Sequence, residues 1–301
     1  MSSVAAQIPR AISGPKPGPK HRAPVWWMIL PALVLLVGFL ILPYVSIVIM
    51  SFREASTRAV YGEGFTIAHY RDIVTDPFIW GIVWRTIRMA LIVTVATLLL
   101  GYPVAYHLAR TRSRMSSLLY ICVISPLLVG LVVRTFAWMI ILSNNGIANG
   151  ALTGLGLVDR PVQLLNTQLG VTIALIHVFL PFVILPLLGN LQAINPEVAL
   201  ASRSLGASRM RTFFKVTLPL SMPGIQAGSI LVFVLSISAY VTPAMLGGTQ
   251  GRTMAVLVVQ YLVDNFRWPA GAALAIFMAL TTLAIVVVYL ALTARAMRRL
   301  P

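Results

Sequence analysis

Lysines, histidines and carboxylates are the side chains that could do chemistry in this chain of 301 residues. A phosphate-binding loop ends in Gly-Lys-Ser or Gly-Lys-Thr, but Lys16, Lys20 and Lys215 follow Pro, Pro and Phe. The four histidines are scattered, and none has a Cys or carboxylate neighbour at metal-ligand spacing: His21, His69, His107 and His177. We therefore expect no catalytic residue, no metal site and no cofactor, so that any ATP is bound by another polypeptide.

The seven acidic residues lie between the long apolar runs of the sequence rather than inside them: Glu54, Glu63, Asp72, Asp76, Asp159, Glu197 and Asp264. Proton- and sodium-coupled carriers commonly keep carboxylates within the bilayer, where a charge is costly and usually functional. We therefore expect no proton relay within this chain.

Two other polar residues do lie inside apolar runs. Arg134 is about eight residues, or ~12 Å at 1.5 Å per residue, from the outer end of its run. Such an arginine needs carbonyls, water or a partner. It is either a structural anchor that reaches the interface or part of a pathway or subunit interface. His177 is interpreted as a satisfied polar group beside the prolines of a kinked helix.

Aromatic and hydroxyl side chains could bind an ammonium group without a buried carboxylate. Trp138, Tyr240 and Thr242 are the candidates, since cation–π contacts need only an aromatic face, and packing at a core or interface is the alternative. Residues 240–243, which end in Pro243 and precede the glycines at 247–248, also predict an interrupted helix. Irregular backbone at membrane depth must be buried in protein or line a cavity.

A polar and basic segment, residues 195–224, separates two long apolar runs and could bind a protein partner. Pro196 suits a first helical turn, and residues 197–205 contain no helix breaker. Gly206 then predicts a sharp corner with φ above zero. A second helix is expected at about residues 207–217, ended by two prolines, Pro219 and Pro223.

The second of these helices is expected to be amphipathic and cationic. Its basic and apolar residues are interleaved: Arg209, Arg211 and Lys215 with Met210, Phe213, Phe214 and Val216. Large aromatic side chains tend to dominate protein contacts, so Phe213 and Phe214 are the expected anchors on a partner, with the arginines at the rim. The alternative is that the two rings pack on the protein's own helices.

Composition indicates a membrane protein with several spans. The chain is 58% hydrophobic and 10% charged, with a mean hydropathy of +0.90, which leaves too little polar surface to cover a water-soluble globule. The formal charge of +16 comes from short clusters of Lys and Arg between apolar runs, a pattern that sets membrane orientation and argues against nucleic-acid binding. The single cysteine, Cys122, lies in an apolar run and is expected to pack there.

Residues 1–24 combine prolines and basic residues and are expected to be a disordered cytoplasmic tail. Residues 25–301 are expected to form one all-α membrane domain of six transmembrane helices, since each apolar run is long enough to cross a bilayer. The spans are predicted at about residues 25–51, 82–108, 117–142, 170–191, 224–246 and 272–294. The first is too long for the apolar part of a cleaved signal peptide.

An even number of spans places both termini on one side of the membrane. On that side the tail, two loops and the C-terminus hold 14 Lys and Arg residues, against six in the opposite loops, or eight with Arg85 and Arg88. The positive-inside rule therefore predicts that both termini and residues 195–224 are cytoplasmic.

Residues 195–224 resemble the cytoplasmic signature of the permease subunits of bacterial ABC importers, which reads Glu-Ala-Ala, three residues, Gly, nine residues, Ile-x-Leu-Pro. The residues in register are Gly206, Val216, Leu218 and Pro219. Leu200, Ala201 and Ser202 stand where Glu-Ala-Ala is expected, and the nearest carboxylate is Glu197. We call residues 195–224 the coupling segment. An ordinary basic loop with a surface helix is the alternative.

Further patches resemble the spermidine/putrescine-type branch of this family. They are Tyr70 with Asp76 and Pro77, residues 101–106 (Gly-Tyr-Pro-Val-Ala-Tyr), 134–138 (Arg-Thr-Phe-Ala-Trp), 144–146 (Asn-Asn-Gly), 240–248 (Tyr-Val-Thr-Pro-Ala-Met-Leu-Gly-Gly) and 268–273 (Trp-Pro-x-Gly-Ala-Ala). Together they cover most of residues 60–270 and are far more specific than any one alone.

The resemblance implies a permease subunit in a bacterial inner membrane that carries a polyamine or similar small cationic amine. Its implied partners are a second permease subunit, two cytoplasmic ATPase subunits, an extracytoplasmic solute-binding protein and membrane lipid. The implied ATPase contacts are Ala201, Ser202, Gly206, Arg209, Arg211, Phe213, Phe214, Leu218 and Pro219, and the implied pathway residues are Arg134, Trp138, Tyr240, Thr242 and Pro243. The alternatives are a permease of the same architecture for another small polar solute, and a secondary carrier or channel subunit.

Overall fold

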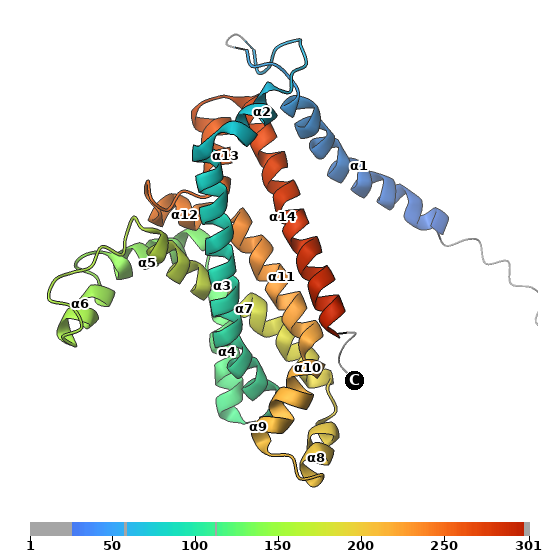
Figure 1. The fold of residues 1–301 in the computed structure, drawn as a ribbon, viewed down its shortest axis with the longest axis vertical. Coiled ribbons are helices and arrows are strands. Elements are labelled where there is room, and N and C mark those ends of the chain that lie inside the picture. The colour runs from blue at the N-terminus through green and yellow to red at the C-terminus, as the bar shows by residue number, and fades with distance from the viewer. Residues whose placement is uncertain (1–25, 57–58, 112, 298–301) are drawn as a thin grey trace, which may run out of the picture. The chain divides into compact units, whose positions relative to one another are not determined.

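The computed structural model describes residues 26–56, 59–111 and 113–297 (Figure 1). The tail predicted at residues 1–24 lies outside the described residues. The chain divides into two compact units, Met1–Ser46 and Ile47–Pro301. In the first unit the described residues form the greater part of helix α1 (Trp26–Ser51), of which Ile29–Ser51 is apolar and long enough to span a membrane.

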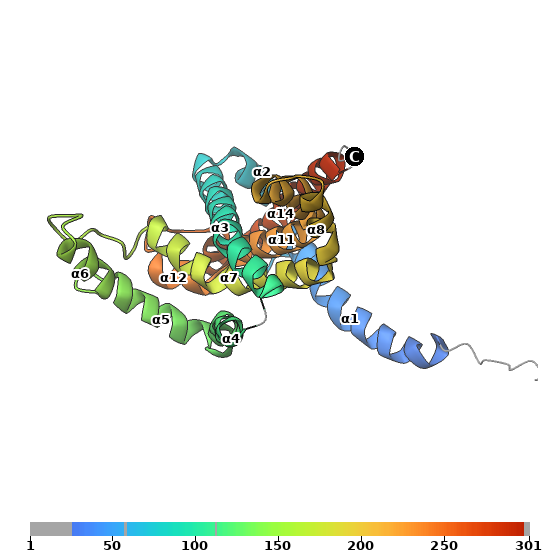
Figure 2. The ribbon, with the colours of Figure 1, turned by 90° about the horizontal axis from the view of Figure 1, so that it is seen from below.

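Four long helices run together in the second unit (Figures 1 and 2): α3 (Pro77–Arg110), α7 (Gln168–Ala193), α11 (Met222–Ser238) and α14 (Trp268–Met297). The main core lies where α3, α7 and α11 meet. Small residues let helices approach closely in a membrane protein, and Gly228 of α11 does so here, since a Cβ on it would lie 3.2 Å from Cα of Val183 on α7. The bundle formed by these helices holds the shorter elements in place.

The all-α prediction is confirmed, since the described residues contain no sheet and only an isolated antiparallel bridge between Arg53 and Phe65. By length and composition, five of the described helical stretches can cross a membrane. The count becomes six if Arg209–Leu220 and Met222–Ser238, which meet at 62°, form one span.

The span predicted at residues 117–142 is wrong as a single helix. The structure has α4 (Arg114–Leu128) and α5 (Leu131–Leu142), separated by extended backbone at Val129 and Gly130. Glycine costs about 1 kcal/mol relative to alanine within a helix, so Gly130 weakens the helix at this point despite the apolar composition of the run. The helical stretch that passes the length test instead runs through α5 and α6 (Ile147–Gly154), as Leu131–Gly154. The expectation that Cys122 packs in a core is also wrong, because its side chain on α4 is exposed.

The interrupted helix predicted near residues 240–243 is present, and the span predicted at residues 224–246 is therefore not continuous. Helix α11 ends at Ser238, and α12 (Val241–Leu246) begins after Ala239 and Tyr240. Within one helix the ring of Pro243 would clash with the carbonyl of Ala239, four residues earlier, so the chain breaks there.

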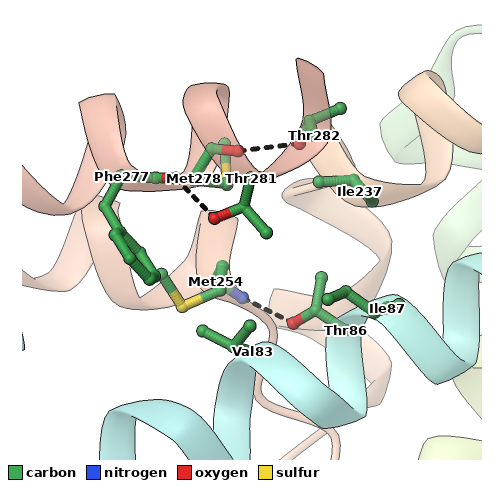
Figure 3. A pocket seen from close by; sticks show the side chains of 9 residues that line it. All are labelled: Val83, Thr86, Ile87, Ile237, Met254, Phe277, Met278, Thr281 and Thr282. Atoms are coloured by element: carbon green, nitrogen blue, oxygen red, sulfur yellow. Dashed lines mark hydrogen bonds between the residues drawn. The ribbon is translucent and has the colours of Figure 1, made fainter. Parts of the chain in front are cut away.

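The sequence interpretation missed a helical stretch in the loop 247–271. Helix α13 (Met254–Val259) continues into the π-helical η2 (Gln260–Asp264). Figure 3 shows how α13 is fixed: the Thr86 hydroxyl of α3 accepts a hydrogen bond from the Met254 amide at 3.0 Å. The void beside this contact is about 10 Å³, the lower limit for one water, so no solute is assigned to it.

The remaining short helix, α2 (Ala68–Thr75), precedes α3. Asp76 ends α2 and caps α3, since its carboxylate accepts the Phe78 amide at 2.8 Å and Pro77 occupies the first turn. Figure 1 places α2 at the opposite end of the bundle from the coupling segment.

Candidate functional site

The coupling segment begins as predicted. Helix α8 (Pro196–Ser204) has Pro196 in its first turn, and the Asn195 side chain caps it by accepting the Glu197 amide at 2.9 Å. These are the residue types that start helices, because proline needs no partner for an amide and asparagine satisfies a free one.

The corner after α8 has the predicted backbone. Gly206 has φ +85°, a conformation that strains residues with a side chain. A Cβ added at Gly206 would meet nothing within 4 Å. The constraint at this position therefore comes from the backbone and not from crowding.

The second helix of the coupling segment runs further than predicted, and its end at residue 217 is wrong. It starts as α9 (Arg209–Thr212), widens into a π-helical turn, η1 (Phe213–Thr217), and continues as α10 (Leu218–Leu220) before the break at Ser221. Pro219 donates no amide hydrogen bond and its ring crowds the carbonyl of Lys215, so the helix widens there instead of stopping.

The two helices of the coupling segment are joined by side chains. The hydroxyls of Ser202 and Thr212 lie 3.2 Å apart, and Thr212 is buried. Leu218 and Pro219 are half-buried. The predicted partner-facing residues that are exposed are Ala201, Gly206, Arg209, Arg211 and Phe214.

The two phenylalanines take different positions. Phe213 is half-buried, and its ring lies edge-to-face with Tyr102 of α3 at 5.6 Å between centroids, so it packs on the protein's own helices. Phe214 is 57% exposed and remains available to a partner. The interpretation missed Leu205, which is 89% exposed beside the corner; its place just before a predicted glycine corner was the available signal.

Arg134 holds the junction between α4 and α5. Its guanidinium donates to the carbonyl of Val129 at 2.7 Å and also to that of Pro126. These carbonyls lie at the end of α4, where a helix leaves its last acceptors unpaired and a cation is favourable. Of the groups expected to satisfy Arg134, which were carbonyls, water or a partner, the structure shows carbonyls, those at the end of α4.

Trp138 lies one turn after Arg134 on α5 and contacts His177 of α7. Its indole nitrogen donates to Nδ1 of His177 at 3.3 Å, and the ring centroids are 5.5 Å apart. His177 is therefore a satisfied polar group, as expected. The histidine is exposed and the tryptophan half-buried, so both present part of their rings outside the core.

Helices α5 and α12 meet through two threonines. The hydroxyls of Thr135 and Thr242 lie 3.4 Å apart, and both residues are buried, with Thr242 2% exposed. Thr242 and the buried Pro243 therefore position α12 and present no surface to a solute, unlike Tyr240, which is 42% exposed. In the described part of the chain no group of three His, Cys, Asp or Glu residues could hold a metal ion.

Comparisons with known proteins agree with this arrangement. Residues 97–300 match the family model described as "Binding-protein-dependent transport system inner membrane component". The spermidine/putrescine transport system permease protein PotB of Escherichia coli K12 is 33% identical over 84% of this chain and 92% of its own length. PotB of Salmonella typhimurium LT2 is 34% identical over 80% and 84%.

A crystal structure of a bacterial alginate ABC transporter, in complex with an alginate-pentasaccharide-bound periplasmic protein, is similar in fold. Its TM-score is 0.71 at 18% identity, and the match covers 91% of this chain and 96% of the other. The family excludes the alternative of a secondary carrier or channel subunit and makes the protein a non-catalytic, multi-pass component of the inner membrane. The chain belongs to the inner membrane components of binding-protein-dependent transport systems, as a permease subunit of an ABC importer.

Proposed function

We propose that this permease carries a polyamine or a similar small cationic amine, delivered by an extracytoplasmic binding protein and driven by two ATPase subunits. The observation that carries the proposal is the similarity to PotB over more than four fifths of the chain. A second permease subunit, homologous or identical, completes the complex.

The proposed topology has six spans, with both termini and the coupling segment in the cytoplasm. Residues 25–301 then form one permease domain, and residues 1–24 a cytoplasmic tail. The excess of Lys and Arg in the tail, in the coupling segment and in the loop 109–116 supports this orientation. The coupling segment and α2 lie at opposite ends of the bundle, as a cytoplasmic and an outer element would (Figure 1).

The proposed ATPase contact is the exposed side of the coupling segment. Leu205, Met210 and Phe214 are 89%, 68% and 57% exposed, and an apolar group of this kind beside arginines is suited to a protein contact. Arg209 and Arg211 lie on α9, as Met210 does. They supply polar contacts at the rim of the proposed ATPase contact.

A cationic solute is compatible with the polar residues of the bundle. The positive charge of Arg134 is directed at the carbonyls of α4, which lessens its repulsion of a cationic solute. The exposed parts of Trp138 and Tyr240 offer aromatic faces, which bind ammonium groups by about 0.5–2 kcal/mol. The threonine pair Thr135–Thr242 joins α5, which carries Trp138, to α12, which Tyr240 directly precedes.

A permease of the same architecture for another small polar solute is the second candidate, because the alginate transporter has this fold and a different solute. The two candidates are separated by measuring binding of spermidine and putrescine to the cognate binding protein. ATP-driven uptake of the amine that binds is then measured in proteoliposomes of the full complex. Amine binding followed by ATP-dependent uptake is expected, and a binding protein that takes neither amine would contradict the polyamine assignment.

A further inference from the structure

Ser221 lies at a bend in the helical bundle. There Arg209–Leu220 meets Met222–Ser238 at 62°, and Ser221 is fully buried. Its hydroxyl donates to the carbonyl of Leu218 at 2.9 Å, and its amide donates to the carbonyls of Thr217 and Leu218 at 2.9 and 3.2 Å. Ser221 therefore closes the bend with its own backbone and side chain.

A second helix contributes to this bend. The hydroxyl of Tyr102 on α3 lies 3.0 Å from the hydroxyl of Ser221. A hydroxyl has one proton, and that of Ser221 is used on Leu218. In the arrangement in which Ser221 donates to Leu218, Tyr102 is the donor and the Ser221 oxygen the acceptor.

The ring of Tyr102 also contacts the coupling segment. Phe213 packs edge-to-face on Tyr102 and, at 6.0 Å between centroids, on Tyr106 one turn further along α3. Tyr102 thus touches η1 of the coupling segment through its ring and the bend at Ser221, near the end of the same segment, through its hydroxyl.

The stretch between these two contacts has an unusual geometry. Residues Phe213–Thr217 form the π-helical η1, and such turns occur frequently at functional sites. A residue advances a helix by about 100° at 3.6 residues per turn, so conversion of η1 to α-helix would turn Phe213 about 100° relative to Ser221. Such a conversion would move Phe213 relative to Ser221 and so disturb the pair of contacts that Tyr102 makes with them.

We propose that Tyr102 is a positioning residue that transmits movement of the coupling segment to α3 and α11. A displacement of Phe213 acts on Tyr102 through the contact between their rings. The hydrogen bond between Tyr102 and Ser221 fixes the bend to α3. This inference rests on the proposed docking of the coupling segment on the ATPase subunits.

Tyr102→Phe and Ser221→Ala remove one side each of the hydrogen bond and keep the Tyr102 ring. The matched control is Tyr106→Phe, because the Tyr106 hydroxyl has no hydrogen bond among the described residues. The complex of permease, ATPase and lipid is purified, and ATP hydrolysis is measured with and without its purified binding protein. Loss of a neutral hydrogen bond changes an equilibrium constant by about five-fold. The stimulation of ATP hydrolysis by the binding protein is therefore expected to fall about five-fold in each variant.

Ser221→Ala also removes the hydrogen bond to Leu218, so the double variant is expected to fall no further than Ser221→Ala alone, because Tyr102→Phe removes only a bond that Ser221→Ala already removes. Co-purification of the ATPase subunits is expected to be unchanged, and Tyr106→Phe should resemble the unaltered protein. If Tyr102→Phe does not assemble, Ser221→Ala tests the bond from the other side.

Three results would overturn the proposal: full stimulation in Tyr102→Phe and Ser221→Ala, an equal loss in Tyr106→Phe, or losses that multiply in the double variant. Failure of the docking proposal is distinguishable, because Gly206→Val would then also keep full stimulation. Full stimulation in Tyr102→Phe together with a loss in Gly206→Val would reject the role of Tyr102 alone.

Discussion

The hydroxyls of Ser202 and Thr212 meet at 3.2 Å across the corner that Gly206 makes. Ser202 belongs to α8 and Thr212 to α9, so this contact fixes the angle between the two helices of the coupling segment. Thr212 is buried while Leu205 at the corner is exposed, which gives the segment an inner side held by the protein and an outer side open to a partner.

Substitution of Gly206 should disturb this corner through the backbone. Gly206→Val places a β-branched side chain at φ +85°, where a non-glycine residue is strained by about 1–2 kcal/mol, although no neighbouring atom is in its way. We expect the variant to insert in the membrane but to retain less ATPase subunit on co-purification, with binding-protein-stimulated hydrolysis and uptake reduced together. Gly206→Asn is the control, because asparagine tolerates positive φ. A fully assembled and fully coupled Gly206→Val complex would refute this prediction.

Removal of the Arg134 guanidinium should destabilise the junction of α4 and α5. Arg134→Met keeps the length and loses the hydrogen bonds to the carbonyls of Pro126 and Val129. Hydrogen bonds to charged groups contribute about 1.5–3 kcal/mol each, so we expect a loss of about 2 kcal/mol or more in the free energy of unfolding. Thermal unfolding in detergent measures it, with the exposed Arg160→Gln as control. Equal unfolding midpoints for the two variants would show that Arg134 does not hold the junction.

The aromatic face of Trp138 is expected to matter for a cationic solute. Trp138→Leu removes the ring and should lower the initial rate of amine uptake about two- to thirtyfold, from a cation–π contribution of about 0.5–2 kcal/mol. Trp138→Phe keeps an aromatic face and should retain more of the rate. Trp84→Leu, at a 64% exposed position on α3, is the control for loss of a tryptophan in general. The prediction fails if Trp138→Leu and Trp138→Phe transport equally well.

Transport is expected to follow ATP without a proton gradient. The seven carboxylates all lie outside the predicted spans, so this chain offers no acidic relay within the bilayer. In ATP-loaded proteoliposomes of the full complex, collapse of the proton gradient should leave uptake unchanged, while omission of ATP should abolish it. Uptake that stops when the gradient collapses would contradict this energetic account.

Local features of the fold could be predicted from the sequence. Pro196 and Gly206 act on their own backbone, so their place in a first turn and at a corner with positive φ followed from residue type. The break near Tyr240 could likewise be expected, because Pro243 excludes a helical carbonyl four residues earlier.

Features that depend on distant residues could not be predicted. The carbonyl of Val129 at the end of α4 accepts a hydrogen bond from Arg134. The break at Gly130 therefore depends on a side chain in the next helix. Helix α13 is fixed by Thr86, 168 residues before Met254. The bond between Tyr102 and Ser221 joins residues 119 apart, and no spacing in the sequence indicates it.

The central claim is that the exposed side of the coupling segment contacts the ATPase subunits in the cytoplasm. Cross-linking from single cysteines tests it most directly. The exposed Cys122 is first replaced by alanine, and a cysteine is placed either at Leu205 or at Ile67, which is 72% exposed and directly precedes α2, at the opposite end of the bundle.

Each single-cysteine complex is labelled with a short photo-activated cross-linker and examined for covalent adducts. The account predicts an adduct with an ATPase subunit from Leu205→Cys and none from Ile67→Cys. An ATPase adduct from Ile67→Cys with none from Leu205→Cys, in complexes that retain ATP-driven uptake, would contradict it.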